Sequence, residues 1–195
     1  MARKKSTQPL IIVIITLILS AIMGEQWLSS GNKTPNPPQS PDVTSPSGET
    51  ENVDFNQCSV VNVTDGDTLR LRCVGANEDI RVRLYCIDAP ESKQTPWGTS
   101  SKEYLRSIAG NTVRVVKINI DRYQRVVGEI YNGNANLNLA MVKAGKAAVY
   151  RQYCKKREPY EAAEEQAQHA KEGIWKTEGL HQTPWEWRKQ QREMD

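Results

Sequence analysis

Two short stretches of this chain place carboxylates directly after predicted strand ends. Asp67 follows the Asp65–Gly66 turn in VTDGDTLRLR, and Asp88 follows an apolar run in RLYCIDAPES. Carboxylates on neighbouring strand ends can converge on one hard cation, and calcium accepts such ligands together with carbonyl oxygens and waters. The two stretches therefore predict a calcium site with open positions for phosphate oxygen and water.

Three further residues suit the hydrolysis of a phosphate ester at such a site. Arg83 and Arg125 could each make two hydrogen bonds to a phosphoryl group and stabilise the charge that develops during transfer. Glu91 needs no metal role, so it could orient or deprotonate the attacking water. Arg83 precedes Asp88 by an odd number of residues, which places them on opposite faces of a flat strand. The hypothesis therefore requires a twist or bulge between them.

Each of these residues also has an ordinary structural explanation. We expect Asp65 to be a turn former rather than a metal ligand, and Asp67 could serve the turn as well. Both arginines could belong to surface ion pairs, and Asp88 could accept backbone hydrogen bonds in its loop. The basic run at residues 155–157 could steer a phosphate backbone, but a solvated charged surface is the favoured explanation. The whole set, rather than any single residue, indicates catalysis.

Five short strands and about three helices are expected to position these side chains. Alternating apolar residues predict strands at 59–64, 69–74, 80–87, 112–120 and 126–131. Helices are predicted at 101–109, 137–144 and 160–172, the first opened by a capping box of Ser100 and Glu103. Short strands with inserted helices predict an α+β fold, a small Greek-key barrel packed by helices.

The composition of the first 57 residues differs from that of the rest of the chain. Three basic residues precede an apolar run at residues 10–24, so residues 1–28 are expected to be a signal-anchor or a cleaved signal peptide. An anchor would hold the protein on the outer side of the membrane, and cleavage would make it secreted. Residues 29–57 are rich in Ser and Pro, which predicts a disordered linker.

The remaining residues form the predicted folded domain, residues 58–176, and a C-terminal extension, residues 177–195. The formal net charge of the 195-residue chain is only +3, which does not by itself mark a nucleic-acid binder. We expect the protein to be monomeric.

All four cysteines lie inside the predicted domain, and none has the spacing of a zinc site. Cys58 and Cys73 flank the predicted turn almost symmetrically, so a hairpin would bring them together. Cys86 would then pair with Cys154, a pattern that suits an exported protein. Buried free thiols are the alternative.

Three segments together resemble the signatures of the staphylococcal nuclease (thermonuclease) family. They are DGDT at residues 65–68, RLYCIDAPE at 83–91 and DRYQRVVGEI at 121–130, and the similarity runs from about residue 59 to residue 175. The resemblance implies an OB-fold barrel that hydrolyses DNA and RNA with calcium and leaves 3′-phosphate ends. Single strands are the expected substrates.

The resemblance also implies a role for each matching residue. Asp67 and Asp88 would bind calcium together with the backbone carbonyl of Ala89, which stands where the family has threonine. Arg83 and Arg125 would stabilise the transition state, and Glu91 would be the general base. Gln124 replaces a glycine of the family pattern, which could shift the approach of its neighbour Arg125.

Three tyrosines could contact the nucleotide. Tyr123 lies beside Arg125, and Tyr150 and Tyr153 lie near the nucleotide-contacting tyrosines of the family, where an aromatic face could stack on any base. Ordinary packing at the rim of the site is the alternative.

The leading hypothesis is a calcium-dependent nuclease that acts on DNA and RNA without sugar specificity. One alternative is a membrane-tethered OB-fold module that binds nucleic acid with little or no catalysis. A cell-surface interaction protein is another, and it predicts no calcium dependence. A pure binder has no need for clustered acids facing a polyanion, so the retained acids and arginines favour the nuclease.

Overall fold

The computed structural model describes residues 52–194. The expected membrane-directed segment and most of the expected linker lie outside these residues. Within the described part of the chain, no helix has both the length and the apolar character that a membrane span requires.

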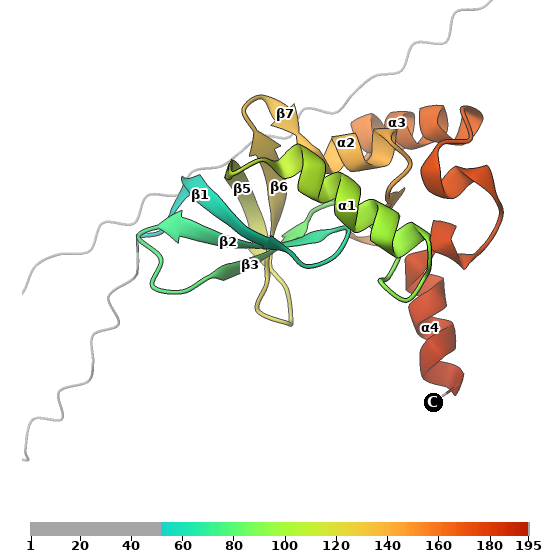
Figure 1. The fold of residues 1–195 in the computed structure, drawn as a ribbon, viewed down its shortest axis with the longest axis horizontal. Coiled ribbons are helices and arrows are strands. Elements are labelled where there is room, and N and C mark those ends of the chain that lie inside the picture. Colours follow the sequence, from blue (N-terminus) through green and yellow to red (C-terminus); the bar gives the residue numbers. More distant parts are fainter. Residues whose placement is uncertain (1–51, 195) are drawn as a thin grey trace, which may run out of the picture. The chain divides into compact units, whose positions relative to one another are not determined.

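Five strands close into a barrel (Figure 1). They are β1 (Asp54–Val63), β2 (Thr68–Val74), β3 (Ile80–Leu84), β5 (Thr112–Ile120) and β6 (Val126–Asn132). Neighbours in the order β3-β2-β1-β5-β6 pair antiparallel, and a parallel pairing of β3 with β6 closes the barrel. This mixed barrel with helices confirms the expected α+β OB-fold.

Four α-helices and several shorter elements accompany the barrel in the described residues. The helices are α1 (Trp97–Ala109), α2 (Leu137–Lys143), α3 (Glu158–His169) and α4 (Pro184–Met194). The short strands are β4 (Ile87–Asp88), β7 (Ala135–Asn136) and β8 (Ala148–Val149), and the 3-10 turns are η1 (Arg151–Tyr153), η2 (Gly173–Lys176) and η3 (Leu180–Gln182). The sequence pattern did not predict α4, which lies in the C-terminal extension.

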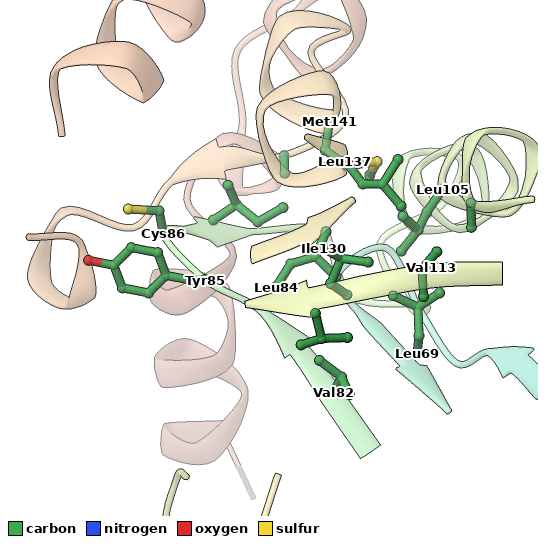
Figure 2. Packing of buried hydrophobic residues seen from close by; sticks show 14 of the residues in the cluster. Leu69, Val82, Leu84, Tyr85, Cys86, Leu105, Val113, Ile130, Leu137 and Met141 are labelled. Carbon is green, nitrogen blue, oxygen red and sulfur yellow. The ribbon is translucent and has the colours of Figure 1, made fainter. Parts of the chain in front are cut away.

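The core is built from the inward faces of the strands and from two helices. In β2, Leu69 and Leu71 are buried while the arginines between and after them are exposed, which is the alternation of a barrel strand. Leu105 from α1 and Met141 from α2 gather with Ile130 of β6 in this core (Figure 2). Each such side chain contributes about 1.5–3 kcal/mol through burial, so the barrel is a firm support for its loops.

The predicted strand 80–87 is wrong at its C-terminal end. β3 stops at Leu84, and Cys86 has a φ of 69°, in the left-handed region. The chain then resumes as β4, which pairs with β8 rather than with the barrel. The side chain of Asn138 stabilises this break, because its amide donates to the carbonyl of Tyr85 at 2.9 Å.

The predicted start of the first helix is also wrong. α1 begins at Trp97, so Ser100 and Glu103 lie inside the helix and form no capping box. The hydroxyl of Ser100 instead accepts a hydrogen bond from Lys146 Nζ at 2.7 Å. A tertiary contact has therefore replaced the local capping interaction that the sequence pattern indicated.

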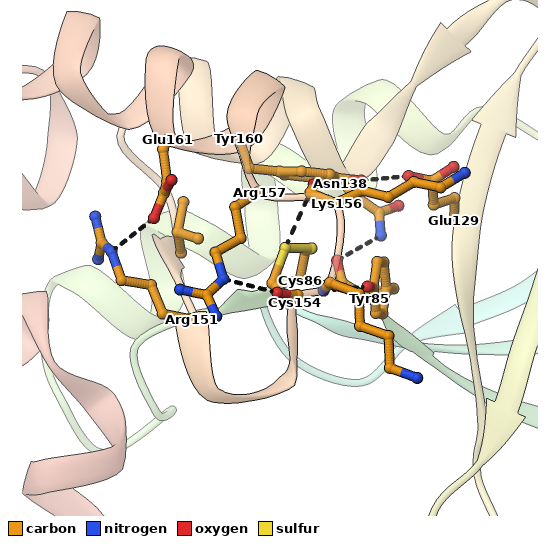
Figure 3. Close-up of a disulfide and its surroundings, with 12 residues drawn as sticks. Tyr85, Cys86, Glu129, Asn138, Arg151, Cys154, Lys156, Arg157, Tyr160 and Glu161 are labelled. Carbon is orange, nitrogen blue, oxygen red and sulfur yellow. Dashed lines mark hydrogen bonds and ion pairs between the residues drawn. A yellow bond between two sulfur atoms is a disulfide. The ribbon is translucent and has the colours of Figure 1, made fainter. Parts of the chain in front are cut away.

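Two disulfides link parts of the described chain. Cys58 is joined to Cys73 across the β1–β2 pair. Cys86 is joined to Cys154, which connects the β3–β4 break to the segment before α3 (Figure 3). The Tyr85 hydroxyl accepts a hydrogen bond from the backbone N–H of Lys155 at 2.6 Å, so the same two segments are held together twice.

Candidate active site

The two predicted metal-binding carboxylates lie on either side of one arginine. Arg83 Nη1 donates to Asp67 Oδ2 at 2.5 Å, and Arg83 Nη2 donates to Asp88 Oδ1 at 2.9 Å. Asp67 is 6% exposed and Asp88 is fully buried. The structure therefore brings together the acid that precedes β2 and the acid that ends β4.

The break between β3 and β4 makes this meeting possible. Arg83 lies near the end of β3 and Asp88 ends β4, and the left-handed Cys86 between them reverses the alternation of side chains. Arg83 Nη2 also donates to the carbonyl of Ile87 at 3.2 Å, so the guanidinium is held against the second strand. The required irregularity is thus a left-handed residue rather than a gradual twist.

The Asp65–Asp67 turn packs tightly against the loop after β4. A Cβ atom on Gly66 would lie 2.6 Å from the Cβ atoms of both Ala89 and Ser101, so only glycine fits. The backbone N–H of Ala89 donates to Asp67 Oδ2 at 3.3 Å. Ala89 therefore adjoins both carboxylates.

Asp65 accepts a hydrogen bond within the turn. Its Oδ1 accepts from the backbone N–H of Asp67 at 3.0 Å, the pattern of a turn-forming aspartate. Burial, with the neighbouring charge of Asp67, raises the pKa of Asp65 to about 7.

The pKa values of Asp67 and Asp88 differ in direction. Burial opposes the charged form of Asp67, but the adjacent Arg83 guanidinium outweighs it and lowers the pKa. For Asp88, burial and the charge of Asp67 raise the pKa, although Arg188 and Arg83 oppose that effect. A cation beside both groups would favour their ionised forms.

The oxygen donors at this point suit a hard cation. The described residues contain no cluster of three or more His, Cys, Asp or Glu side chains that could hold a metal. Two carboxylates with a neighbouring backbone carbonyl still match the oxygen chemistry that calcium accepts, because calcium completes its coordination with water. Asp67, Asp88 and the Ala89 carbonyl fit such a site.

Arg125 reaches the same region from the turn between β5 and β6. Its Nε donates to Asp121 Oδ2 at 2.8 Å, and its Nη1 lies 3.5 Å from Thr68 Oγ1. The Thr68 hydroxyl in turn donates to Asp67 Oδ1 at 2.9 Å. Gln124 adopts a φ of 60°, the left-handed conformation that the family glycine would adopt more easily.

Glu91 lies in the loop between β4 and α1. Its backbone N–H donates to Gln94 Oε1 at 2.8 Å, and a Cβ on Gly98 would meet the Glu91 carbonyl at 2.1 Å. The start of α1 is thus packed directly on this loop and fixes its path. The side chain of Glu91 is 35% exposed and can face solvent or substrate.

Arg188 is the residue of this site that the sequence did not reveal. From α4, its Nη2 donates to Asp88 Oδ2 at 2.7 Å and its Nη1 donates to Glu91 Oε1 at 2.6 Å. A third contact joins Nη1 to Asp88 Oδ1 at 3.2 Å. Nearly a hundred residues separate it from these acids, so no local pattern could have indicated the contact.

The three predicted nucleotide-contacting tyrosines lie on different segments. Tyr123 is 55% exposed, and the Arg125 guanidinium lies 5.5 Å from the centre of its ring. Tyr150 follows β8, whose residue Ala148 pairs with Asp88. Its ring centre lies 4.9 Å from that of Tyr153.

Tyr150 also carries a stacked partner. The ring of Trp185, from α4, lies 5.2 Å away at an interplanar angle of 9°. Burial, with the charge of Asp88, raises the pKa of Tyr150. Tyr150 is therefore close to the buried acid, and one face of its ring is covered by an indole.

Comparison with known proteins agrees with this geometry. The family described as "Staphylococcal nuclease homologue" matches residues 81–177. A protein of Haemophilus influenzae named "Uncharacterized endonuclease" is 40% identical over 139 residues, which cover 70% of this chain and 75% of that protein. An Escherichia coli protein of the same name is 39% identical over 132 residues, covering 66% of this chain and 82% of that protein. The "Micrococcal nuclease" of Shigella flexneri is 35% identical over 142 residues, 67% of this chain and 79% of its own length. The chain therefore belongs to the staphylococcal nuclease family.

Proposed function

We propose that this protein is a calcium-dependent phosphodiesterase that hydrolyses DNA and RNA and leaves 3′-phosphate ends. The observation that carries the proposal is the pair of buried carboxylates, Asp67 and Asp88, held on either side of Arg83. Relatives named as nucleases support the same reaction class. Buried acids that face a polyanion would only weaken binding, so their presence argues for chemistry at the phosphate.

Asp67, Asp88 and the carbonyl of Ala89 would hold the calcium ion. When bound, calcium would neutralise charge on the phosphate and act as a Lewis acid. Asp88 is fully buried and Asp67 nearly so, which keeps both carboxylates in fixed positions.

The arginines and Glu91 would carry the remaining chemistry. Arg83 and Arg125 donate to the phosphate oxygens and stabilise the additional negative charge of the transition state. Glu91 accepts a proton from water while the water oxygen bonds to phosphorus. The bond from phosphorus to the 5′-oxygen breaks, and that oxygen leaves with a proton from solvent.

Substrate would lie along the exposed aromatic residues of the site. Tyr123 and Tyr153 are 55% and 63% exposed, which leaves ring surface available for stacking. Stacking on tyrosine does not read base identity and requires an unpaired base. The proposed substrates are therefore single strands of DNA or RNA without sequence preference.

The location of this activity is a separate proposal. The basic and apolar N-terminal segment, residues 1–28, would direct the domain out of the cytoplasm, either as an anchor or as a cleaved signal. The predicted linker, residues 29–57, would then connect that segment to a monomeric nuclease domain, except that its last four residues belong to β1 and the domain begins at Asp54 rather than at residue 58.

The test is cleavage of a fluorescent single-stranded oligonucleotide by the full-length chain in a mild detergent. We expect cutting with calcium and none with excess chelator, and Glu91→Gln should lower kcat by about 10²–10⁴-fold. Glu165→Gln, on the exposed face of α3, is the matched control and should cut normally.

Two results would contradict the proposal. Cutting that persists in chelator would remove calcium from the mechanism, and normal turnover by Glu91→Gln would remove the general base. Tight binding with no cutting by the wild type would instead support the OB-fold binding module.

A further inference from the structure

The C-terminal residues 178–194 extend beyond the segment that the family model matches, and they reach the candidate active site. We propose that α4 is an intramolecular latch: Arg188 holds Asp88, one of the two proposed calcium-binding carboxylates, together with Glu91, and Trp185 stacks on Tyr150. Calcium and substrate can then bind only when α4 is released. The inference rests on the proposed function, since it assigns a regulator to the same site.

Arg188 uses the oxygen atoms that the cation needs. Asp88 Oδ1 accepts from both Arg83 and Arg188, and Oδ2 accepts from Arg188 at 2.7 Å. The carboxylate has no exposed surface, so it offers no other side for approach. A divalent cation on these oxygens would lie against the Arg188 guanidinium, and the two like charges would repel each other. Calcium and Arg188 are therefore alternative occupants of Asp88.

The same guanidinium also blocks the proposed base. Arg188 Nη1 donates to Glu91 Oε1 at 2.6 Å. A carboxylate oxygen held in a short charge-assisted bond is a poor acceptor for a proton from water. Arg188 therefore engages a proposed calcium ligand and the proposed base at the same time.

Trp185 supplies a second and independent contact at the substrate side. Its ring is nearly parallel to that of Tyr150, at 5.2 Å between centres and 9° between planes. This is the geometry that a stacked nucleobase would adopt on the same tyrosine. One helix thus carries a side chain on a proposed calcium ligand and a side chain on a proposed stacking residue, three residues apart.

The helix is attached firmly at one end and loosely along its length. The preceding η3 turn is fixed to the domain, because Gln94 Nε2 donates to the Leu180 carbonyl at 3.0 Å and His181 stacks on Trp97 at 4.6 Å. Within α4, Pro184 at the first position is the only buried residue. Four other side chains of α4, both tryptophans among them, are half-buried and the rest are exposed, so the helix can detach locally while its attachment point remains in place.

The first test is calcium titration by isothermal titration calorimetry on the full-length chain in a mild detergent. If the latch is closed in 90–99% of molecules, opening it tightens the apparent calcium affinity by about 10–100-fold. Arg188→Ala should show this gain. Trp185→Ala should shift the affinity in the same direction, although its ring contacts Tyr150 rather than a carboxylate. Lys189→Ala, whose side chain is 71% exposed on the same helix, is the control and should match the wild type.

The second test follows the helix itself by hydrogen exchange. Adding calcium to the wild type should speed exchange of α4 amides, while amides of α3 keep their protection. In the double variant Arg188→Ala/Trp185→Ala, the gain in affinity should not exceed the larger single effect, because an open latch cannot be opened twice.

The outcomes separate this proposal from the proposed function. Equal calcium affinity in the wild type and Arg188→Ala, with calcium-dependent cutting intact, overturns the latch alone. A gain in Arg188→Ala with none in Trp185→Ala reduces the effect to removal of one local charge and also overturns it. Absence of calcium binding in all variants overturns both the latch and the calcium assignment.

Discussion

Asn138 is the buried polar residue that fixes the break on which the active site depends. Its side chain is fully buried; its Oδ1 accepts from the backbone N–H of Ile130, and its Nδ2 donates to the carbonyls of Tyr85 and Gly128. Asn138→Leu keeps the branched shape and the number of heavy atoms of the side chain and removes all three bonds. The Gly128 carbonyl retains the N–H of Tyr85 at 2.8 Å, but the groups on Ile130 and Tyr85 lose these partners.

The expected loss of stability follows from these two groups. A buried backbone group without a partner costs about 1–3 kcal/mol, so the pair costs about 2–6 kcal/mol. The additional apolar surface of leucine returns about 1 kcal/mol, which leaves a net loss of about 3 kcal/mol. For a folded unit of this size each kcal/mol lowers Tm by about 3–4 °C. Circular dichroism should therefore show Asn138→Leu melting about 10 °C below the wild type.

The control is the same substitution at an exposed asparagine. Asn134 lies in the turn between β6 and β7, and Asn134→Leu should change stability by less than about 0.5 kcal/mol. If Asn138→Leu instead melts within about 2 °C of the wild type, the hydrogen bonds of Asn138 do not stabilise the break and the reasoning is refuted.

Two further predictions concern pH and the disulfides. Burial opposes the charge of Asp121, but hydrogen bonds from Arg125 outweigh it and lower the pKa, so the stability that Asp121 contributes is present above its ordinary pKa and is lost as pH falls through the lowered value. The Tm difference between the wild type and Asp121→Asn should thus be constant near neutral pH and shrink below about pH 4, and a difference that stays constant to pH 2 would contradict the assignment. Replacing Cys86 and Cys154 by alanine opens a loop of 68 residues and should cost about 4 kcal/mol, against about 3 kcal/mol for the 15-residue loop of the other disulfide. Urea unfolding of the two double variants measures both losses of stability. If the wild type instead unfolds at the same urea concentration with and without reductant, neither disulfide stabilises the fold.

The barrel was predictable because its strands obey a simple period. The alternation of apolar residues in β2 and in the first half of β5 indicates which side chains face the core, and the glycines and asparagines between strands mark the turns. The meeting of Asp67 with Arg83 follows from this pattern, since Thr68 pairs with Arg83 in the β2–β3 register.

The position of Asp88 was not predictable from periodicity. It depends on Cys86 adopting a left-handed conformation, which is uncommon for a residue other than glycine. Long-range contacts support that conformation, among them the Asn138 amide and the link to Cys154. A local sequence pattern contains no information about such long-range contacts. The alternation of apolar residues therefore predicted one continuous strand through the break.

The start of α1 also depends on tertiary contacts that the local sequence pattern does not reveal. Ser100 and Glu103 have the spacing of a capping box, yet the helix begins at Trp97. Gly98 lets the first turn of the helix approach the Glu91 carbonyl closely, because a larger side chain at this position would collide with that carbonyl. Tertiary contact thus sets the boundary of this helix, and it also fixes the loop that carries Glu91.

The contacts of Arg83 and Arg188 indicate which arginine would leave a calcium-bound site. Arg83 is 15% exposed and lies on a barrel strand, whereas Arg188 is 30% exposed and lies on a helix with one buried residue. With both arginines present, the three ionised carboxylates (Asp67, Asp88 and Glu91) leave the site with a net charge of about −1. Exchanging Arg188 for a divalent cation would remove this net charge and would favour ionised Asp88, whose pKa burial now raises. Burial and attachment therefore favour Arg83 as the arginine that stays beside the acids and Arg188 as the replaceable one.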